Sequence, residues 1–244
     1  MKKILLLSFL LSGFFANTQD NAVMGAPTNN LGLMGAEEGT MNFNALDISK
    51  ISGVFYEFDD IRFSKIPTDG SVYLFDSWDN SGVIIVGENR FVTTNINLHI
   101  NQDKFMTQLD NDSTFVFDFK GIDKVLIGGR TFKSFYNSKE GKNKIMEVTF
   151  ENEQLKLLKG FSVSFVEGSE NPMLSRSRNK IKLSTKYYLY KNGTLSHFKL
   201  KKKDILNLYS GNHVSEIEAY IKRNRLSYKK EKDLVKILQY ASSL

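Results

Sequence analysis

The stretch YLFDSWDNSGVI, from Tyr73 to Ile84, contains the only tryptophan of the chain, Trp78, between the carboxylates of Asp76 and Asp79. Closely spaced carboxylates could bind a cation. A calcium loop, however, needs six to eight oxygen ligands at alternating positions, and here an aromatic ring occupies one of them. The order Asp79-Asn80-Ser81-Gly82 is instead typical of a hairpin turn, because Asn and Gly tolerate a positive φ.

A strand from Ser71 to Trp78 would lead into this turn and place Trp78 at the end of a sheet. Large aromatic side chains carry much of the binding energy of protein interfaces. We therefore treat Trp78 as a candidate partner-binding residue.

Three common catalytic arrangements are missing from the sequence. The chain has no cysteine and no Gly-x-Ser-x-Gly motif, and its three histidines never lie four residues apart. We expect a protein that acts by binding rather than catalysis, with no cofactor and no metal. One catalytic alternative remains open, a carboxylate-dependent glycan hydrolase, because two aspartates among Asp59, Asp60, Asp76 and Asp79 could face each other across a cleft.

Positive charge is concentrated in the C-terminal tail. From Lys199 onward there are 11 basic and 5 acidic residues, whereas the segment from Gln19 to Phe198 carries 20 basic and 22 acidic residues. The candidate residues for binding an anionic surface are Lys201, Lys202, Lys203, Lys222, Arg223, Arg225, Lys229 and Lys230.

Two of these residues give a stronger reason than the others to expect an anionic ligand. Lys229 and Lys230 are predicted to lie in the first turn of a helix, where they would oppose the helix dipole. An anionic lipid or polysaccharide would relieve that repulsion. We expect no nucleic-acid partner, because the tyrosines of the tail do not form a stacking platform on a strand.

The N-terminus has the composition of an export signal. Lys2 and Lys3 precede an apolar run from Ile4 to Phe15, and small residues follow. The run is about a dozen residues long, whereas a membrane-spanning helix needs roughly 20. We predict a signal peptide over residues 1–18, and a mature protein in the periplasm or associated with the outer membrane or cell surface, with no transmembrane span.

Residues 19–46 form a leader rich in Asn, Gly, Ala and Met, without a period of 2 or 3.6. This composition predicts a disordered segment. Met24 and Met34 lie in two similar short stretches, VMGAPT and LMGAEE, and are more apolar than a spacer requires. They are candidate partner-binding residues.

Alternation of apolar and polar residues dominates residues 47–200. It is clearest in Phe91–Ile100 and recurs at Phe115, Phe117, Phe119 and at Phe161, Val163, Phe165, with turn signals such as Gly128-Gly129 and Asn192-Gly193 between such runs. This pattern predicts a mainly β domain, an antiparallel meander of about nine or ten strands that is sandwich-like or barrel-like.

The period changes to that of a helix in residues 201–244. A short helix is expected over Asp204–Tyr209, and apolar residues then recur at helical spacing around Ile217 and again around Ile237. We predict a basic module containing a small α-helical hairpin, with Ser227 as the N-cap of its second helix.

Together these features favour an exported bacterial cell-envelope accessory or interaction protein, which binds protein partners or an anionic envelope surface. The alternatives are a barrel-like protein that binds a small lipid or sugar, and the glycan hydrolase described above.

Overall fold

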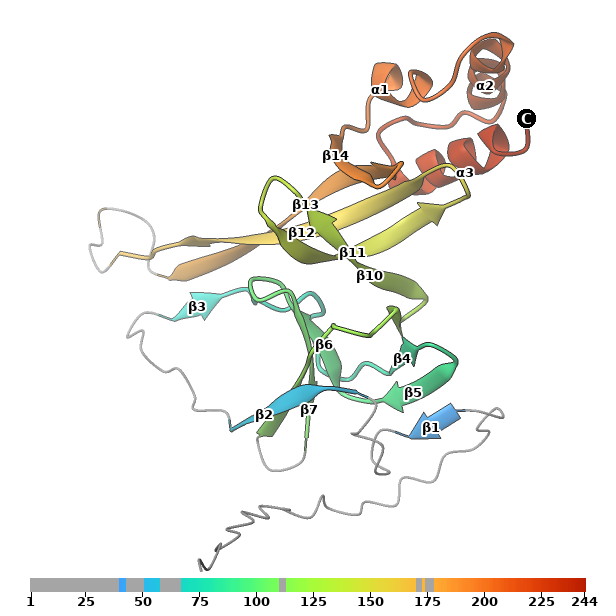
Figure 1. Cartoon of the computed structure of the whole chain (residues 1–244). Helices are drawn as coiled ribbons and strands as arrows, with labels where there is room; N and C mark the ends of the chain where they lie inside the picture. The colour runs from blue at the N-terminus through green and yellow to red at the C-terminus, as the bar shows by residue number, and fades with distance from the viewer. Residues whose placement is uncertain (1–39, 43–50, 58–66, 110–112, 170–172, 174–177) are drawn as a thin grey trace, which may run out of the picture. The chain divides into compact units, whose positions relative to one another are not determined.

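The computed structural model describes residues 40–42, 51–57, 67–109, 113–169, 173 and 178–244. Over these residues the chain is mainly β, with two sheets followed by helices at the C-terminus (Figure 1), which confirms the predicted class. The signal peptide, most of the leader, Met24, Met34, Asp59 and Asp60 lie outside the described residues and remain predictions.

The larger sheet contains ten strands. In spatial order they are β1 (Thr40–Asn42), β5 (Asn89–Thr93), β4 (Gly82–Val86), β9 (Lys124–Ile127), β10 (Arg130–Asn137), β11 (Lys142–Glu151), β12 (Lys156–Val166), β13 (Asn179–Lys191) and β14 (Thr194–Phe198), with β3 (Thr68–Asp69) paired to the start of β13. The smaller sheet has the order β2 (Gly53–Glu57), β8 (Ser113–Phe117), β7 (Lys104–Gln108) and β6 (Ile96–His99).

The strands from β10 to β14 form an antiparallel meander, as the turn signals predict. Gly128-Gly129 and Asn192-Gly193 each form a two-residue hairpin loop in which both residues have positive φ, the conformation that matches strand twist. The rest of the topology is more complex than a meander. Two strand pairs, β1–β5 and β3–β13, are parallel. In addition, β4 pairs with β9, although β6, β7 and β8, which lie between them in the sequence, belong to the second sheet. Over the described residues neither strand path closes into a barrel.

A β-bulge in β11 changes which side chains face the helices. Glu147 pairs with Lys159 and Val148 with Leu158, but Phe150 then pairs with Leu157, so that Thr149 has no partner residue. The Thr149 hydroxyl donates a hydrogen bond to the Leu157 carbonyl oxygen at 3.0 Å. The extra residue turns Phe150 to the opposite face, and strict alternation does not predict this.

Buried side chains form three clusters. The first joins both sheets and includes Phe105, Phe117 and Phe132. The second lies between the helices and β12–β14 and includes Leu157, while the third covers the other face of the meander around Leu158. Neighbouring residues of β12 therefore serve different clusters, as expected for a strand buried on both faces.

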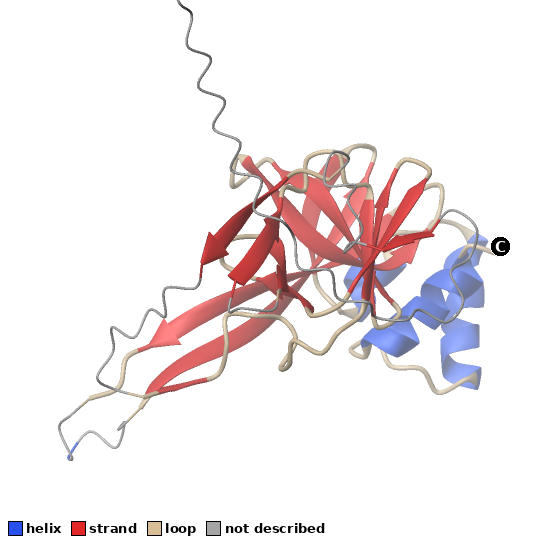
Figure 2. Cartoon of the chain, turned by 90° about the horizontal axis from the view of Figure 1, so that it is seen from below, coloured by secondary structure: helices blue, strands red, loops and turns tan. Residues whose placement is uncertain are grey.

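The C-terminal helices are α1 (Lys202–Leu206), α2 (Asn212–Arg223) and α3 (Glu231–Ala241), grouped together in Figure 2. The apolar stripes of α2 and α3 are buried in the second cluster at Ile217, Leu234 and Ile237. In the described part of the chain no helix is long and apolar enough to cross a membrane.

The predicted N-cap of the last helix is wrong. The helix begins at Glu231 with Lys230 in the N-cap position and without a side-chain cap. Ser227 belongs to a turn before the helix, where its hydroxyl accepts a hydrogen bond from the Lys229 N–H and its own N–H donates to Asp233. The short helix also starts earlier than predicted, at Lys202.

Gly53 in β2 is a packing constraint that can be tested. A Cβ at this position would lie 2.2 Å from Cζ of Phe115 and 2.6 Å from the Val116 carbonyl oxygen on the paired strand β8. We expect Gly53→Ala to lower the free energy of unfolding by about 1–3 kcal/mol, because the backbone oxygen cannot move without breaking the pair. Thermal denaturation would measure this, with Ser52→Ala at the exposed neighbour as control. Equal melting temperatures for all three proteins would contradict it.

Candidate functional site

The segment around Trp78 runs beside β6 without forming the strand predicted over Ser71–Trp78. The Leu74 N–H donates to the Leu98 carbonyl oxygen at 2.9 Å, and a single bridge joins Tyr73 to His99. Beyond this bridge the chain is a series of bends. The strand prediction is wrong because side-chain hydrogen bonds replace most of the backbone ladder.

Asn97 of β6 makes those hydrogen bonds. Its side-chain oxygen accepts from the Phe75 N–H at 3.1 Å, and its side-chain nitrogen donates to the carbonyl oxygens of Phe75 and Ser77 at 2.9 and 3.1 Å. The residue is 1% exposed. Alternation within Phe91–Ile100 predicts Asn97 on a polar face, and nothing in the sequence distinguishes this amide from an exposed one.

The acidic side chains beside Trp78 do not build a cation site. Asp76 and Asp79 are both exposed, and the described residues contain no cluster of three or more acidic or histidine side chains that could hold a metal ion. Asn80 organises the turn instead, since its side-chain nitrogen donates to the carbonyl oxygens of Ser77 and Ile96.

Trp78 is part of a half-buried aromatic cluster. The ring of Tyr73 lies between those of Trp78 and His99, with centroid distances of 4.8 and 5.1 Å and edge-to-face geometry. Burial raises the pKa of Tyr73, and burial lowers the pKa of His99 despite an opposing backbone hydrogen bond. Both shifts favour uncharged rings near neutral pH, so this surface is suited to packing rather than proton transfer.

All eight cations proposed to bind an anionic surface are exposed. The Nζ atom of Lys202 lies 2.5 Å from the Glu218 carboxylate, which places the start of α1 beside the middle of α2, one turn before Lys222. Burial raises the pKa of Tyr228, while the nearby charge of Lys202 opposes this shift, so the loop that carries Lys229 and Lys230 lies near Lys202. The structure thus relates segments of the tail that are distant in sequence.

Most acidic residues of the tail have partners within the protein, and one of these partners, Lys202, is itself a candidate cation. Glu218 pairs with Lys202, Asp233 accepts the Ser227 N–H, and Glu231 contacts the sheet. Three of the five carboxylates therefore have internal partners. Among the described residues, Lys201, Lys203 and Lys230 form no ion pair, and the outer surface of the module is left basic.

Lys229 and Lys230 do not lie in the first turn of the last helix, and that part of the prediction is wrong. Both residues precede α3, and the first turn of the helix contains Glu231 and Asp233, whose negative charges the dipole favours. Both lysines are exposed, and Lys230 lies at the N-cap of the helix.

A row of charged and aromatic side chains crosses one face of the meander. Phe132, Glu147, Lys159 and Tyr187 pair with one another on successive strands from β10 to β13. The guanidinium of Arg130 lies 2.7 Å from the Glu147 carboxylate and 5.1 Å from the ring centroids of Phe75 and Phe132. Phe132 at one end of the row belongs to the core between the sheets, and Tyr187 at the other end packs against the core beneath the helices.

Glu231 of α3 completes the row. Its carboxylate accepts a hydrogen bond from the Tyr187 hydroxyl at 2.6 Å and lies 2.9 Å from Nζ of Lys159. Burial alone would raise the pKa of Glu231, but these hydrogen bonds outweigh it and hold the pKa below its ordinary value. Burial, followed by the contact with Glu231, raises the pKa of Tyr187. The arrangement fixes the helix on the sheet and leaves the tyrosine protonated.

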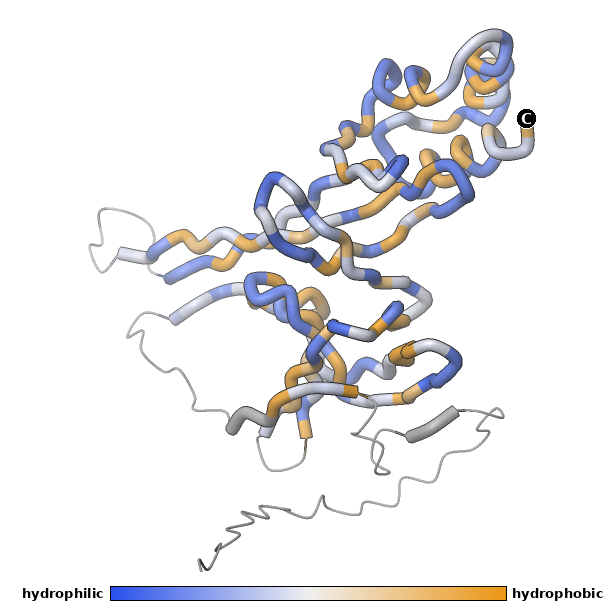
Figure 3. Tube along the Cα trace, viewed as in Figure 1, coloured by the Kyte–Doolittle hydropathy of each residue, from blue (hydrophilic) through white to orange (hydrophobic). Residues whose placement is uncertain are grey.

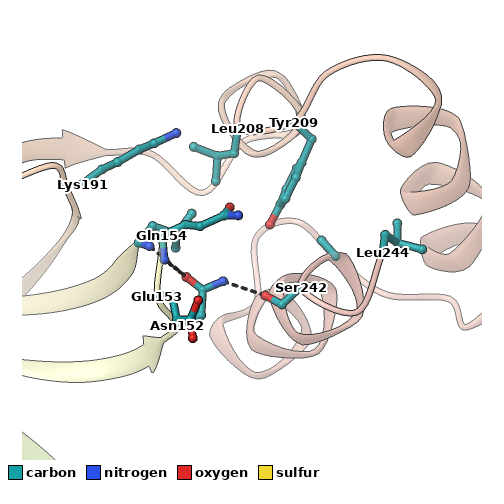
Figure 4. A pocket seen from close by; sticks show the side chains of 10 residues that line it. Asn152, Glu153, Gln154, Lys191, Leu208, Tyr209, Ser242 and Leu244 are labelled. Atoms are coloured by element: carbon teal, nitrogen blue, oxygen red, sulfur yellow. Dashed lines mark hydrogen bonds between the residues drawn. The ribbon is translucent and has the colours of Figure 1, made fainter.

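A small pocket of about 250 Å³ lies where α3 ends against the β11–β12 turn (Figure 4). The Asn152 side chain spans this turn, donating to the Ser242 hydroxyl at 2.8 Å and accepting from the N–H groups of Gln154 and Leu155. Small-molecule sites usually enclose about 300–1,000 Å³. The contacts of Asn152 account for the pocket as part of helix docking.

No known protein family, curated protein or solved structure matches the chain. The fold itself defines the class, a mainly β protein with two sheets and C-terminal helices.

The hydrogen bonds of Asn97 predict a specific local effect. Asn97→Leu keeps the approximate volume but leaves the Phe75 N–H without its acceptor, at a cost of about 1–3 kcal/mol. Because Trp78 is the only tryptophan, its fluorescence reports on this segment alone. We expect a red-shifted emission and stronger quenching by acrylamide. Asn207→Leu at an exposed position is the control, and unchanged emission in Asn97→Leu would contradict the role of the amide.

The contacts of Glu231 predict a pH dependence at both extremes. The lowered pKa of Glu231 stabilises the fold above its unfolded pKa of about 4.5, and this contribution is lost as pH falls through the lower folded value. The raised pKa of Tyr187 stabilises the fold below its unfolded pKa of about 10, and this contribution is lost at higher pH.

Urea unfolding of two variants measures these contributions. At pH 7, Glu231→Gln should unfold more easily than the wild type by about 1–2 kcal/mol, because a partly exposed charged hydrogen bond is lost. The difference should shrink below pH 4. Tyr187→Phe should lose less stability than the wild type as pH rises above 10. Glu153→Gln, at an exposed residue of the β11–β12 turn, is the control, and a pH-independent difference for Glu231→Gln would be the contrary result.

Proposed function

We propose that the chain is an exported bacterial cell-envelope protein that acts by binding rather than catalysis. In this proposal the basic outer surface of the helical module contacts an anionic component of the envelope, either lipid or polysaccharide. The proposal rests on a difference between the positive and the negative side chains of the module. Its eight candidate cations are exposed, while three of the five carboxylates are engaged by internal partners.

The fixed position of the module supports the proposal. The helices pack on the sheet through a buried apolar cluster, and Glu231 attaches α3 to β12 and β13. The cations are thus presented by a folded surface, which can contact several anionic groups at once. Lysines close to an anionic membrane surface contribute about 1 kcal/mol each at physiological ionic strength.

A second candidate surface is the aromatic cluster of Tyr73, Trp78 and His99. The half-buried Trp78 ring and the exposed carboxylates of Asp76 and Asp79 fit a contact with another protein better than a contact with an anionic surface. In the proposal this cluster contacts a protein partner, as predicted for Trp78 from the sequence. Met24 and Met34 of the leader also contact a protein partner.

The two alternative functions have weaker support. A barrel-like binder of lipid or sugar needs an internal cavity, but Phe115, Phe117 and Phe161 are buried in the shared core. A glycan hydrolase needs two facing carboxylates. Asp76 and Asp79 are exposed beside a turn, and no described contact relates either of them to a facing carboxylate.

The test is charge reversal on the tail. The variant Lys201→Glu/Lys203→Glu/Lys230→Glu leaves Lys202 unchanged, because Lys202 pairs with Glu218. Loss of three lysine contacts should weaken binding to phosphatidylglycerol vesicles at least roughly 100-fold. Co-sedimentation with these vesicles, with phosphatidylcholine vesicles and with a soluble anionic polysaccharide, at low and high salt, would measure the effect and distinguish the two anionic sources.

The matched control is Lys180→Glu/Lys182→Glu/Lys186→Glu, which reverses three exposed lysines of β13 and gives the same net charge. We expect this control to lose much less binding. An equal loss of vesicle binding in both variants would mean that net charge, and not the position of the lysines in the tail, determines binding. Absence of wild-type binding to either anionic probe would overturn the proposed role of the tail.

A further inference from the structure

The hairpin of β12 and β13 extends beyond β11 and β14, as Figures 1 and 2 show. Pairing of β11 with β12 ends at Glu147 and Lys159, whereas β12 and β13 remain paired out to Val166 and Lys180. We call residues 160–166 and 179–186 the arm. Over the described residues, the β12 side of the arm has no paired strand along its outer edge.

The two edges of the arm differ in chemistry. The β13 edge is paired with β3 at one end and β14 at the other, and its open stretch contains Lys182 and Lys186. The β12 edge reads GFSVSFV from Gly160 to Val166, with no charge and no proline. Natural sheets protect exposed edges with charged residues, proline or a covering segment. One edge of the arm is protected in this way, and the described residues provide no such protection for the other.

The apolar face of the arm leads from the protein core into solvent. Phe161 is 4% exposed and Val163 packs against the same core, but Phe165 is 56% exposed. Opposite them on β13, Leu183 is 46% exposed. Serines occupy the other face of β12, and Figure 3 shows hydrophobic and hydrophilic residues alternating along the arm. A large aromatic side chain is therefore left in solvent beside an open strand edge.

The sequence of the open edge is symmetric about Val163. It reads Phe-Ser-Val-Ser-Phe from Phe161 to Phe165 in both directions. In an antiparallel pair the residues directly opposite each other lie on the same face. If a second copy pairs with this edge about Val163, Phe161 meets Phe165, Ser162 meets Ser164, and Val163 meets Val163.

We propose that the β12 edge is a homodimerisation site, at which two copies of the chain join their arms into one antiparallel sheet. A two-fold interface requires a surface that complements itself, and the symmetric edge satisfies this requirement. Aromatic and β-branched cross-strand pairs are also those that stabilise sheets most. Moving the register by one residue would set phenylalanine opposite serine.

The dimer buries side chains and backbone groups that are exposed in a single copy. Each Phe165 moves beside Phe161 of the other copy, whose ring is already part of a core, and the unpaired backbone groups of β12 gain partners. Lys182 and Lys186 are on β13, the outer strand of the combined four-stranded arm, so like charges are not brought together. This site is separate from the basic surface of the helical module and does not depend on the proposed function.

Disulfide trapping tests the register, because the chain contains no cysteine. Directly opposed residues have Cα atoms about 4.5–5.5 Å apart, within the range of a disulfide. Copies carrying Ser164→Cys, mixed with copies carrying Ser162→Cys, should form a disulfide-linked heterodimer on mild oxidation. Either variant alone should not, because its own cysteines would lie about 8 Å apart across the two-fold axis. The full chain is used for both variants.

A pair of lysine variants tests the edge itself. Phe165→Lys introduces a charge on the open edge and should reduce the mass in solution, measured by light scattering, from that of two copies to that of one. Leu183→Lys changes a residue of the same face that is also exposed but lies on β13, and this variant should remain a dimer. Far-ultraviolet circular dichroism and melting temperature verify that both variants are folded.

Each result decides the proposal. A dimer that is lost in Phe165→Lys only, with cross-linking in the mixed sample only, supports edge pairing. A wild-type monomer at micromolar concentration overturns it. A dimer lost in Leu183→Lys as well, or cross-linked equally in all cysteine samples, would point to face-to-face association and would also overturn it.

Discussion

The carboxylate of Glu231 joins the last helix to the meander, and together with the apolar cluster beneath the helices it sets the position of the helical module on the sheet. It is shared by Tyr187 and Lys159, which lie on the two strands that continue into the arm. Toward the other core, Glu147 and Arg130 extend the same row of charges. Partly buried charges are tolerated only when each has a partner, so the row restricts how helices and strands can pack.

The sheet edges at β6 and β12 differ in whether another segment covers them. The edge of β6 is covered by the chain before it, and Asn97 supplies side-chain hydrogen bonds where the backbone ladder stops. This covering also positions Trp78 and Tyr73 at the surface. The edge of β12 beyond Lys159 has no comparable cover among the described residues. An unpaired edge of this composition can form backbone hydrogen bonds with another strand.

Local patterns in the sequence predict the turns and helices but not all of the contacts between strands. The two-residue turns at Gly128-Gly129 and Asn192-Gly193 follow from residues that accept positive φ, and the helices follow from their apolar stripes. The same rules fail at Thr149, where one extra residue reverses the faces of β11, and at Asn97, a buried amide among alternating residues. Both failures depend on contacts with other strands, which are not encoded in the period of a single segment.

The sequence by itself determined the mainly β class, the helical C-terminal region, the concentration of positive charge after Lys199 and the symmetric edge around Val163, because composition and short-range periodicity are properties of the chain alone. Only the tertiary structure decided which charges remain exposed. It pairs Glu218, Asp233 and Glu231 internally, starts α3 after Lys230 and leaves the β12 edge open. The physical reason is that ion pairing, burial and strand pairing depend on distances between residues that are far apart in sequence.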